Sequence, residues 1–83
     1  MSTIRVLYFA AVRDLLGVSE EELELPPGVS RVSDLIAELE RVHPELAGRL
    51  AGVRIALNEE FADAADPVRA GDVIAVIPPV AGG

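Results

Sequence analysis

The sequence predicts an α+β domain in which a mixed sheet of four to five strands carries one main helix on one face. Short runs rich in β-branched and aromatic residues occur near the start, in the middle and near the end of the 83 residues. A single long amphipathic pattern with a helical period lies between them, at residues 32–42. A shorter helical pattern follows the first run, so we expect a short helix after strand 1.

The first third of the chain predicts a strand, the short helix and a second strand. Residues 4–9 are β-branched and aromatic, as in a buried strand. Apolar residues recur at helical spacing within 10–16, and Gly17 stands where a left-handed glycine ends a helix. Residues 22–25 alternate glutamate with leucine, which predicts a strand with one face in solvent. The glutamates at 20–24 indicate a solvated face or a protected sheet edge.

The clearest amphipathic helix follows a turn at residues 26–28. Ser30 is a suitable N-cap, and Asp34 falls in the first turn, where the helix dipole favours a carboxylate. Pro44 ends this helix, and residues 45–50 are expected to add a short helical turn. The apolar positions that form its buried face are Val32, Leu35, Ile36, Leu39 and Val42.

The second half of the chain predicts two or three further strands. Residues 53–57 form one, and residues 61–62 begin a short returning strand after a turn at 58–60. The continuous apolar run 73–77 predicts a central strand. Proline cannot donate a hydrogen bond to a ladder, so pairing should stop at residue 78. We therefore divide the chain into one folded domain over residues 1–77 and an extended tail over residues 78–83, with no internal repeat or linker.

Composition excludes several classes of function. The net charge is −7, with seven arginines and no lysine, so the chain is a poor candidate for binding nucleic acid, whose phosphates attract basic residues. No apolar stretch approaches the 18 or so residues that cross a membrane. The N-terminus lacks the pattern of a signal peptide, and we expect a cytoplasmic protein.

The chain offers few groups for catalysis. His43 is the single histidine, there is no cysteine, and the position of His43 before Pro44 favours a helix-capping role over a catalytic or metal-binding one. We find no pairing of nucleophile and base, no phosphate loop and no cluster of metal ligands. An autonomous enzyme is therefore the weakest of the functions considered.

The tail ends in Gly82-Gly83. Two residues without Cβ atoms can enter a channel too narrow for other side chains, with a carboxylate at the tip. Pro78 and Pro79 stiffen the exit from the sheet, and six residues can reach roughly 18–20 Å. If the chain carries sulfur or an acyl group, no side-chain thiol can hold it, and only the terminal carboxylate remains as the attachment point.

These segments together resemble a known family. Residues 4–17 (IRVLYFAAVRDLLG) are similar to the N-terminal signature of molybdopterin synthase small subunits, and residues 53–61, with Asn58 in the turn, to their middle hairpin. Gly71-Asp72-Val73 and the ending PPVAGG complete the resemblance, which covers nearly the whole chain. It implies a ubiquitin-like β-grasp fold.

The resemblance also implies a mechanism. An ATP-dependent adenylyltransferase, similar to ubiquitin-activating enzymes, would adenylate the carboxylate of Gly83, and a sulfur donor protein would convert it to a thiocarboxylate (a C-terminal 1-thioglycine). The large synthase subunit would receive the tail, and sulfur would pass to cyclic pyranopterin monophosphate to build molybdopterin. The catalytic groups would lie on the large subunit, no cofactor would be bound by this chain, and two small and two large subunits would assemble.

The resemblance places the partner contacts as well. Phe9, Arg13 and Phe61 correspond to interface positions, and Ile77 stands where the family often has an aromatic residue. The partner-bound tail would comprise Pro78, Pro79, Val80, Ala81, Gly82 and Gly83. The alternatives are that the two phenylalanines belong to the core and that Arg13 is an ordinary surface arginine.

Two other functions remain open at this point. The chain could carry sulfur for another pathway, such as thiamine thiazole synthesis, tRNA thiolation or cysteine synthesis. It could also be a ubiquitin-like modifier that forms isopeptide bonds. The N-terminal block favours the molybdopterin pathway, since the other carriers share mainly the fold and the Gly-Gly end.

Overall fold

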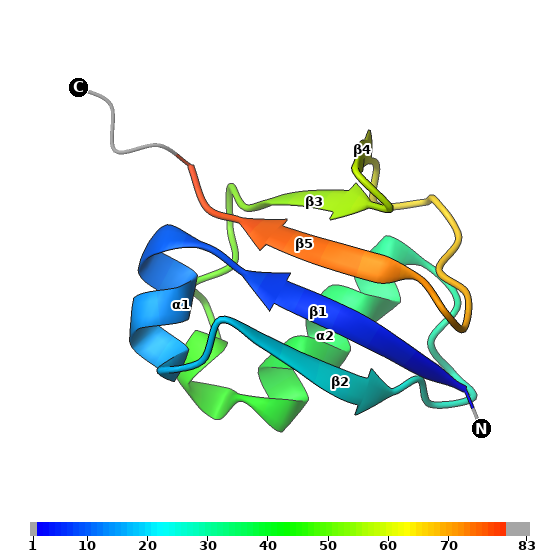
Figure 1. Ribbon diagram of the computed structural model, residues 1–83, viewed down its shortest axis with the longest axis horizontal. Helices are drawn as coiled ribbons and strands as arrows, with labels where there is room; N and C mark the ends of the chain where they lie inside the picture. The colour runs from blue at the N-terminus through cyan, green and yellow to red at the C-terminus, as the bar shows by residue number, and fades with distance from the viewer. Residues whose placement is uncertain (1, 80–83) are drawn as a thin grey trace.

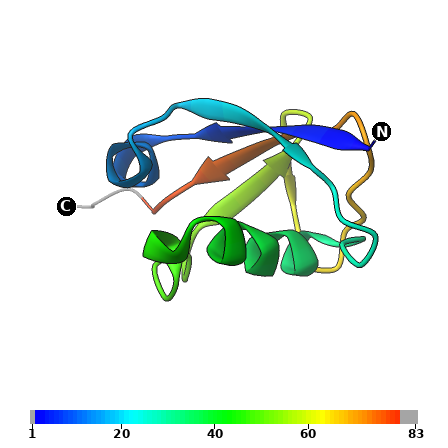
Figure 2. The ribbon, with the colours of Figure 1, turned by 90° about the horizontal axis from the view of Figure 1, so that it is seen from below.

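A computed structural model describes residues 2–79 of the chain. One five-stranded sheet carries α2 across one of its faces, while α1 lies at one end of the sheet (Figures 1 and 2). The strands are β1 (Thr3–Tyr8), β2 (Glu20–Glu24), β3 (Arg54–Leu57), β4 (Glu60–Ala62) and β5 (Val73–Ile77). The helices are α1 (Ala10–Leu16), α2 (Val32–Val42) and the short 3-10 helix η1 (Pro44–Leu46).

The strand order is β2-β1-β5-β3-β4. β1 and β5 run parallel, whereas the other three neighbouring pairs are antiparallel. The prediction that residues 73–77 form a central strand is confirmed, because β5 pairs on both sides and its inward side chains, Ile74 and Val76, are fully buried. The expected mixed sheet with one main helix and a short helix after β1 is also confirmed.

The core lies between the sheet and the helices. Aliphatic side chains fill it, and Tyr8 is its one aromatic residue. Of the apolar positions expected on α2, Val32, Leu35 and Leu39 are buried and Ile36 packs at the edge of the core. Val42 differs from the prediction: it is 36% exposed, because it stands in the last turn, where the helix leaves the core.

The ends of the helices follow the sequence signals with one exception. α1 ends at Gly17 with a φ of 77°, the left-handed conformation that glycine adopts without strain. The predicted N-cap at Ser30 is wrong, since α2 begins after Arg31, which first bridges to Pro67 in an extended conformation. Asp34 is in the first turn as expected, and its carboxylate accepts backbone N–H groups from both Ser30 and Arg31.

The boundaries of β1 and β4 differ from those predicted from the sequence. β1 stops at Tyr8, so Phe9 lies outside the strand. β4 already begins at Glu60, because only Asn58 and Glu59 are needed to reverse the chain, and both have the positive φ of a type I′ hairpin turn. The glutamate-rich β2 is an edge strand, in agreement with the expected edge protection.

Within residues 2–79, no helix has the length and hydropathy needed to cross a membrane.

Candidate functional site

One face of the sheet is left uncovered by the helices, and we call it the open face (Figure 2). Alternation along the strands decides which side chains it presents. Leu7, Ala75 and Ile77 form its apolar centre on β1 and β5 and are all partly exposed. Side chains of β2 border this centre on one side, and those of β3 and β4 border it on the other.

Phe9 and Arg13 lie at the corner between β1 and α1. The backbone turns sharply at Ala10, whose φ is 49°, and Phe9 becomes the residue that precedes the helix. The Phe9 side chain is 43% exposed, so the core alternative for this residue is wrong. Arg13 is exposed, and its nearest carboxylate in the described chain, that of Asp14, is 3.8 Å away. Both side chains are therefore available at the surface.

Phe61 projects from the short β4 strand. It is 62% exposed, the highest value among the large apolar side chains of residues 2–79, so the core alternative fails here as well. The guanidinium of Arg54 lies over the Phe61 ring, 4.0 Å from the ring centroid. Arg54 was not among the residues predicted from the sequence, because it stands within an apolar strand. The available signal was strand alternation, which places Arg54 on the same face as Ala56, the partner of Phe61 in the ladder.

The tail begins beside two of the predicted interface residues, Phe9 and Ile77. Because β1 and β5 are neighbouring parallel strands, their C-terminal ends lie side by side at the same end of the sheet. There the Phe9 N–H donates to the Val76 carbonyl at 3.3 Å. Ile77 is partly exposed on the open face, next to the start of the tail. The structure thus brings Phe9 and Ile77 to the root of the tail.

Pro78 leaves the sheet along a shallow hollow of about 250 Å³ between α1 and η1. The hollow is lined by Ala11, Val12, Leu15, Leu46, Arg49 and Pro78. Pro79 passes Gly52, and a Cβ atom at residue 52 would lie 3.8 Å from its ring. Pairing does stop at the diproline, as predicted. The remaining predicted tail residues, Val80, Ala81, Gly82 and Gly83, lie outside the described residues.

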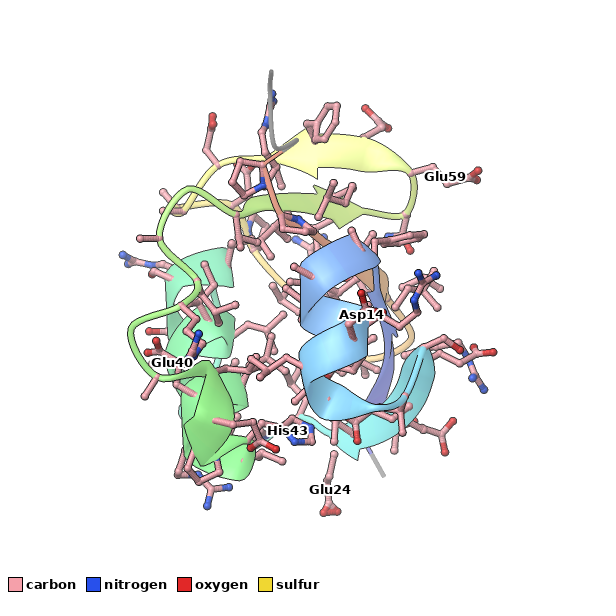
Figure 3. The ribbon with its side chains drawn as sticks, turned by 90° about the vertical axis from the view of Figure 1, so that its left-hand side faces the viewer. Asp14, Glu24, Glu40, His43 and Glu59 are labelled. Carbon is pink, nitrogen blue, oxygen red and sulfur yellow. The ribbon has the colours of Figure 1, made fainter. Side chains whose placement is uncertain are left out.

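His43 takes part in a polar cluster on the inner side of the sheet. It is the C-cap residue of α2, as its sequence position suggested, and its N–H donates to the Leu39 carbonyl. Figure 3 shows His43 between the end of α2 and the sheet. The His43 ring, however, contacts a carboxylate oxygen of Glu21 on β2 at 2.5 Å instead of capping the helix carbonyls. The Tyr8 hydroxyl donates to the same oxygen. The cluster therefore ties α2 to the sheet edge.

Burial is the main reason that the pKa of Tyr8 lies well above its ordinary value, and the hydrogen bond to the Glu21 carboxylate raises it further. Glu21 was not among the residues predicted from the sequence, because it is one of several adjacent glutamates. The alternation of side chains along the strand was the signal available in the sequence, because it places Glu21 on the same side of β2 as Leu23. Among residues 2–79, no three histidine, cysteine or acidic side chains gather in a way that could hold a metal ion.

The described residues form an apolar sheet face beside the root of a C-terminal tail, and no catalytic cluster is found among them. The sequence profile of the ThiS family matches residues 6–83. The chain belongs to the ThiS family.

Curated relatives match nearly end to end. A molybdopterin synthase sulfur carrier subunit from Chlamydomonas reinhardtii is 39% identical, over 96% of this chain and 98% of its own length. The subunit of the same name from Mycobacterium tuberculosis is 36% identical, with both chains fully covered. Sequence similarity therefore extends from the N-terminal block to the tail.

Solved structures match over the same span. A putative molybdopterin converting factor subunit 1 from Pyrococcus furiosus superposes with a TM-score of 0.81 at 39% identity, covering 96% of this chain and all of its own. SAMP1 from Haloferax volcanii gives 0.84 at 26% identity, covering 98% and 99%. In a Helicobacter pylori complex of molybdopterin-converting factor subunits 1 and 2, the matching chain gives 0.68 at 26% identity, covering 98% and 99%. The ThiS-family chain described here has the ubiquitin-like β-grasp fold that its sequence resemblance implied.

Proposed function

We propose that this ThiS-family chain is the sulfur-carrier small subunit of a molybdopterin synthase and works in the cytoplasm. The observation that carries the proposal is the full-length similarity to subunits of that name, from the β1–α1 corner to the PPVAGG ending. The geometry supports it, because the central strand β5 leads directly into the tail. A folded domain followed by a diproline and a Gly-Gly ending suits the delivery of a reactive group to another protein.

The proposed chemistry takes place at the Gly83 carboxylate. An adenylyltransferase joins a carboxylate oxygen to the α-phosphorus of ATP and releases pyrophosphate, which gives the carbonyl carbon a good leaving group. A sulfur donor protein then replaces AMP with sulfur, and the resulting thiocarboxylate passes its sulfur to cyclic pyranopterin monophosphate. The absence of cysteine supports this route, since no side-chain thiol can carry the sulfur.

This chain is a donor subunit without a catalytic centre of its own. Among the described residues, charged side chains form surface pairs such as Arg5–Glu20 and Arg41–Glu38, and the cluster around Glu21 faces the helix side of the sheet. General acid, base and substrate-binding groups are accordingly assigned to the large subunit. No resident cofactor is required of this chain.

The open face and the β1–α1 corner are the proposed docking surface for the large subunit. Phe9, Phe61 and Ile77 supply exposed apolar side chains, and Arg13 supplies a charge at the rim. Their position beside the tail root lets one partner hold the domain and receive Pro78–Gly83 at the same time. The Helicobacter pylori complex supports a second subunit as the partner of such a chain.

The decisive experiment deletes Gly83. The truncated chain should fold with an unchanged melting temperature, because the tail lies beyond the last strand, yet it should fail to support molybdopterin formation in a reaction with activating enzyme, sulfur source, large subunit and pyranopterin. Mass spectrometry of the full chain after activation should show one oxygen replaced by sulfur at the C-terminus. Molybdopterin formation by the truncated chain would refute the mechanism.

A second candidate function is protein modification, which the similarity to SAMP1, a protein described as a small archaeal modifier, favours. In that case the activated carboxylate would form isopeptide bonds with lysines of other proteins. The chain has no lysine and so cannot be its own target. Recovery of the chain attached to lysines in a cell lysate, with no thiocarboxylate detected, would support this candidate over the first.

A further inference from the structure

The open face is electrically uneven from one edge to the other. On the β2 edge, the exposed outward side chains are all carboxylates: Glu20, Glu22 and Glu24. On the opposite side, β3 presents Arg54, above the Phe61 ring of β4. The apolar centre on β1 and β5 separates the two regions. A partner that covers the whole face meets negative charge at one side and positive charge at the other.

The two arginines of the open face have different surroundings. Arg5 is neutralised by Glu20, with its guanidinium nitrogen 2.9 Å from the carboxylate. No carboxylate of residues 2–79 comes within 4.0 Å of the Arg54 guanidinium. One side of that guanidinium is instead covered by the aromatic ring at 4.0 Å. Stacking leaves the edge of the planar group, which carries its N–H donors, free to bind an acceptor.

Arg54 is also close to the root of the tail. It pairs with Ile77 in the ladder between β3 and β5, one residue before Pro78. A protein that holds the tail and rests on the open face therefore passes beside Arg54. A carboxylate is the acceptor that best matches a guanidinium held in one orientation, because it can accept two parallel hydrogen bonds.

We propose that Arg54, held by Phe61, is the charged anchor of the docking surface and receives a carboxylate from the large subunit. The inference rests on the proposed function, which supplies that partner. The Arg54 contact and the carboxylates of β2 together fix the orientation of the partner, since a reversed partner would set like charges against each other. The large subunit should thus present an acidic residue over β3 and basic residues over β2.

The test measures binding of the full-length chain to its purified large subunit by calorimetry, at low and at high salt. Arg54→Met keeps a long packing side chain over Phe61 but removes the charge. Its affinity at low salt should therefore be about tenfold or more below that of the wild type. Added salt should weaken binding of this variant less than it weakens binding of the wild type. Arg54→Lys keeps the charge without the planar fork and should bind with intermediate affinity. Arg41→Met is the matched control, because Arg41 lies on α2, on the covered side of the sheet, and should bind like the wild type.

The outcomes separate the two proposals. If the wild type binds and Arg54→Met binds equally well, or shows the same salt dependence, the role of Arg54 is overturned. The proposed partner then still stands. Failure of the wild-type chain to bind the large subunit overturns the proposed partner and this inference with it. Unchanged melting temperatures in the Arg54 variants, as expected for an exposed side chain, show that any loss of affinity arises at the surface.

Discussion

Tyr8 gives the chain an alkaline limit of stability that can be assigned to one proton. The side chain is 1% exposed, and its hydroxyl donates to Glu21. Burial first, and then that carboxylate, raises the pKa of Tyr8 above the ordinary value of 10.0. In the unfolded chain the phenol loses its proton near pH 10, whereas in the folded chain it retains it. The folded state therefore keeps the full contribution of Tyr8 to its stability below pH 10 and loses it as the pH rises above 10.

The size of the effect follows from the linkage between protons and folding. Where one proton separates the two states, the free energy of unfolding falls by about 1.4 kcal/mol per pH unit. At pH 11 the wild type should therefore be less stable than at pH 9 by about 1.4 kcal/mol. The composition isolates this slope, because the chain has one tyrosine, no cysteine and no lysine. Arginines lose their protons only at still higher pH.

Tyr8→Phe is the perturbation, and urea denaturation followed by circular dichroism at pH 7, 9 and 11 is the assay. Loss of a hydrogen bond to a charged group should cost about 1.5–3 kcal/mol at pH 7. Above pH 10 the variant should show no slope, so the difference from the wild type should shrink by about 1.4 kcal/mol at pH 11. A flat wild-type curve, or an equal slope in Tyr8→Phe, would refute the assignment. Glu21→Gln should retain most of the slope, because burial is the larger cause.

Other predictions concern surface, core and turn. Phe61→Ala should change the free energy of unfolding by less than about 0.5 kcal/mol and yet weaken binding to the large subunit, whereas Leu39→Ala, at a fully buried position, should cost about 2–5 kcal/mol in urea denaturation. A loss of stability in Phe61→Ala comparable with that of Leu39→Ala would contradict the placement of Phe61. Asn58→Ala should lower stability by about 1–2 kcal/mol, since the side chain bonds both Asp72 and the Val73 N–H. Glu59→Gly should raise it by up to about 1 kcal/mol, because residue 59 has a φ of 74°; thermal melting would reveal the opposite sign.

The local elements were predictable because their signals are local. The bounds of α1 and β5 were predicted as they occur, since a period change, a C-terminal glycine and a diproline mark them. One predicted boundary failed because a distant segment decides it: Arg31 replaces Ser30 as the N-cap of α2 because it pairs with Pro67. Glu60 joins β4 because the turn takes only two residues, which leaves Glu60 opposite Leu57.

The docking candidates were predictable only in part. Phe9 and Phe61 were named from the resemblance, but strand-like aromatic residues in a sequence are equally compatible with a core. Their exposure follows from the turn at Ala10 and from the position of β4 at the sheet edge, and both are three-dimensional facts. Arg54 and Glu21 gave weaker signals still, since each gains its role from a residue at least seven positions away.

The sequence by itself determined which groups these 83 residues offer: the ending PPVAGG, no thiol, no lysine and no pairing of nucleophile and base. It also determined the order of strands and helices, because hydrophobic periodicity and turn residues act over a few positions. Only the tertiary structure decided which side chains share the open face and which meet beneath it. Sheet order and register bring together residues far apart in the chain, and local patterns do not specify that pairing.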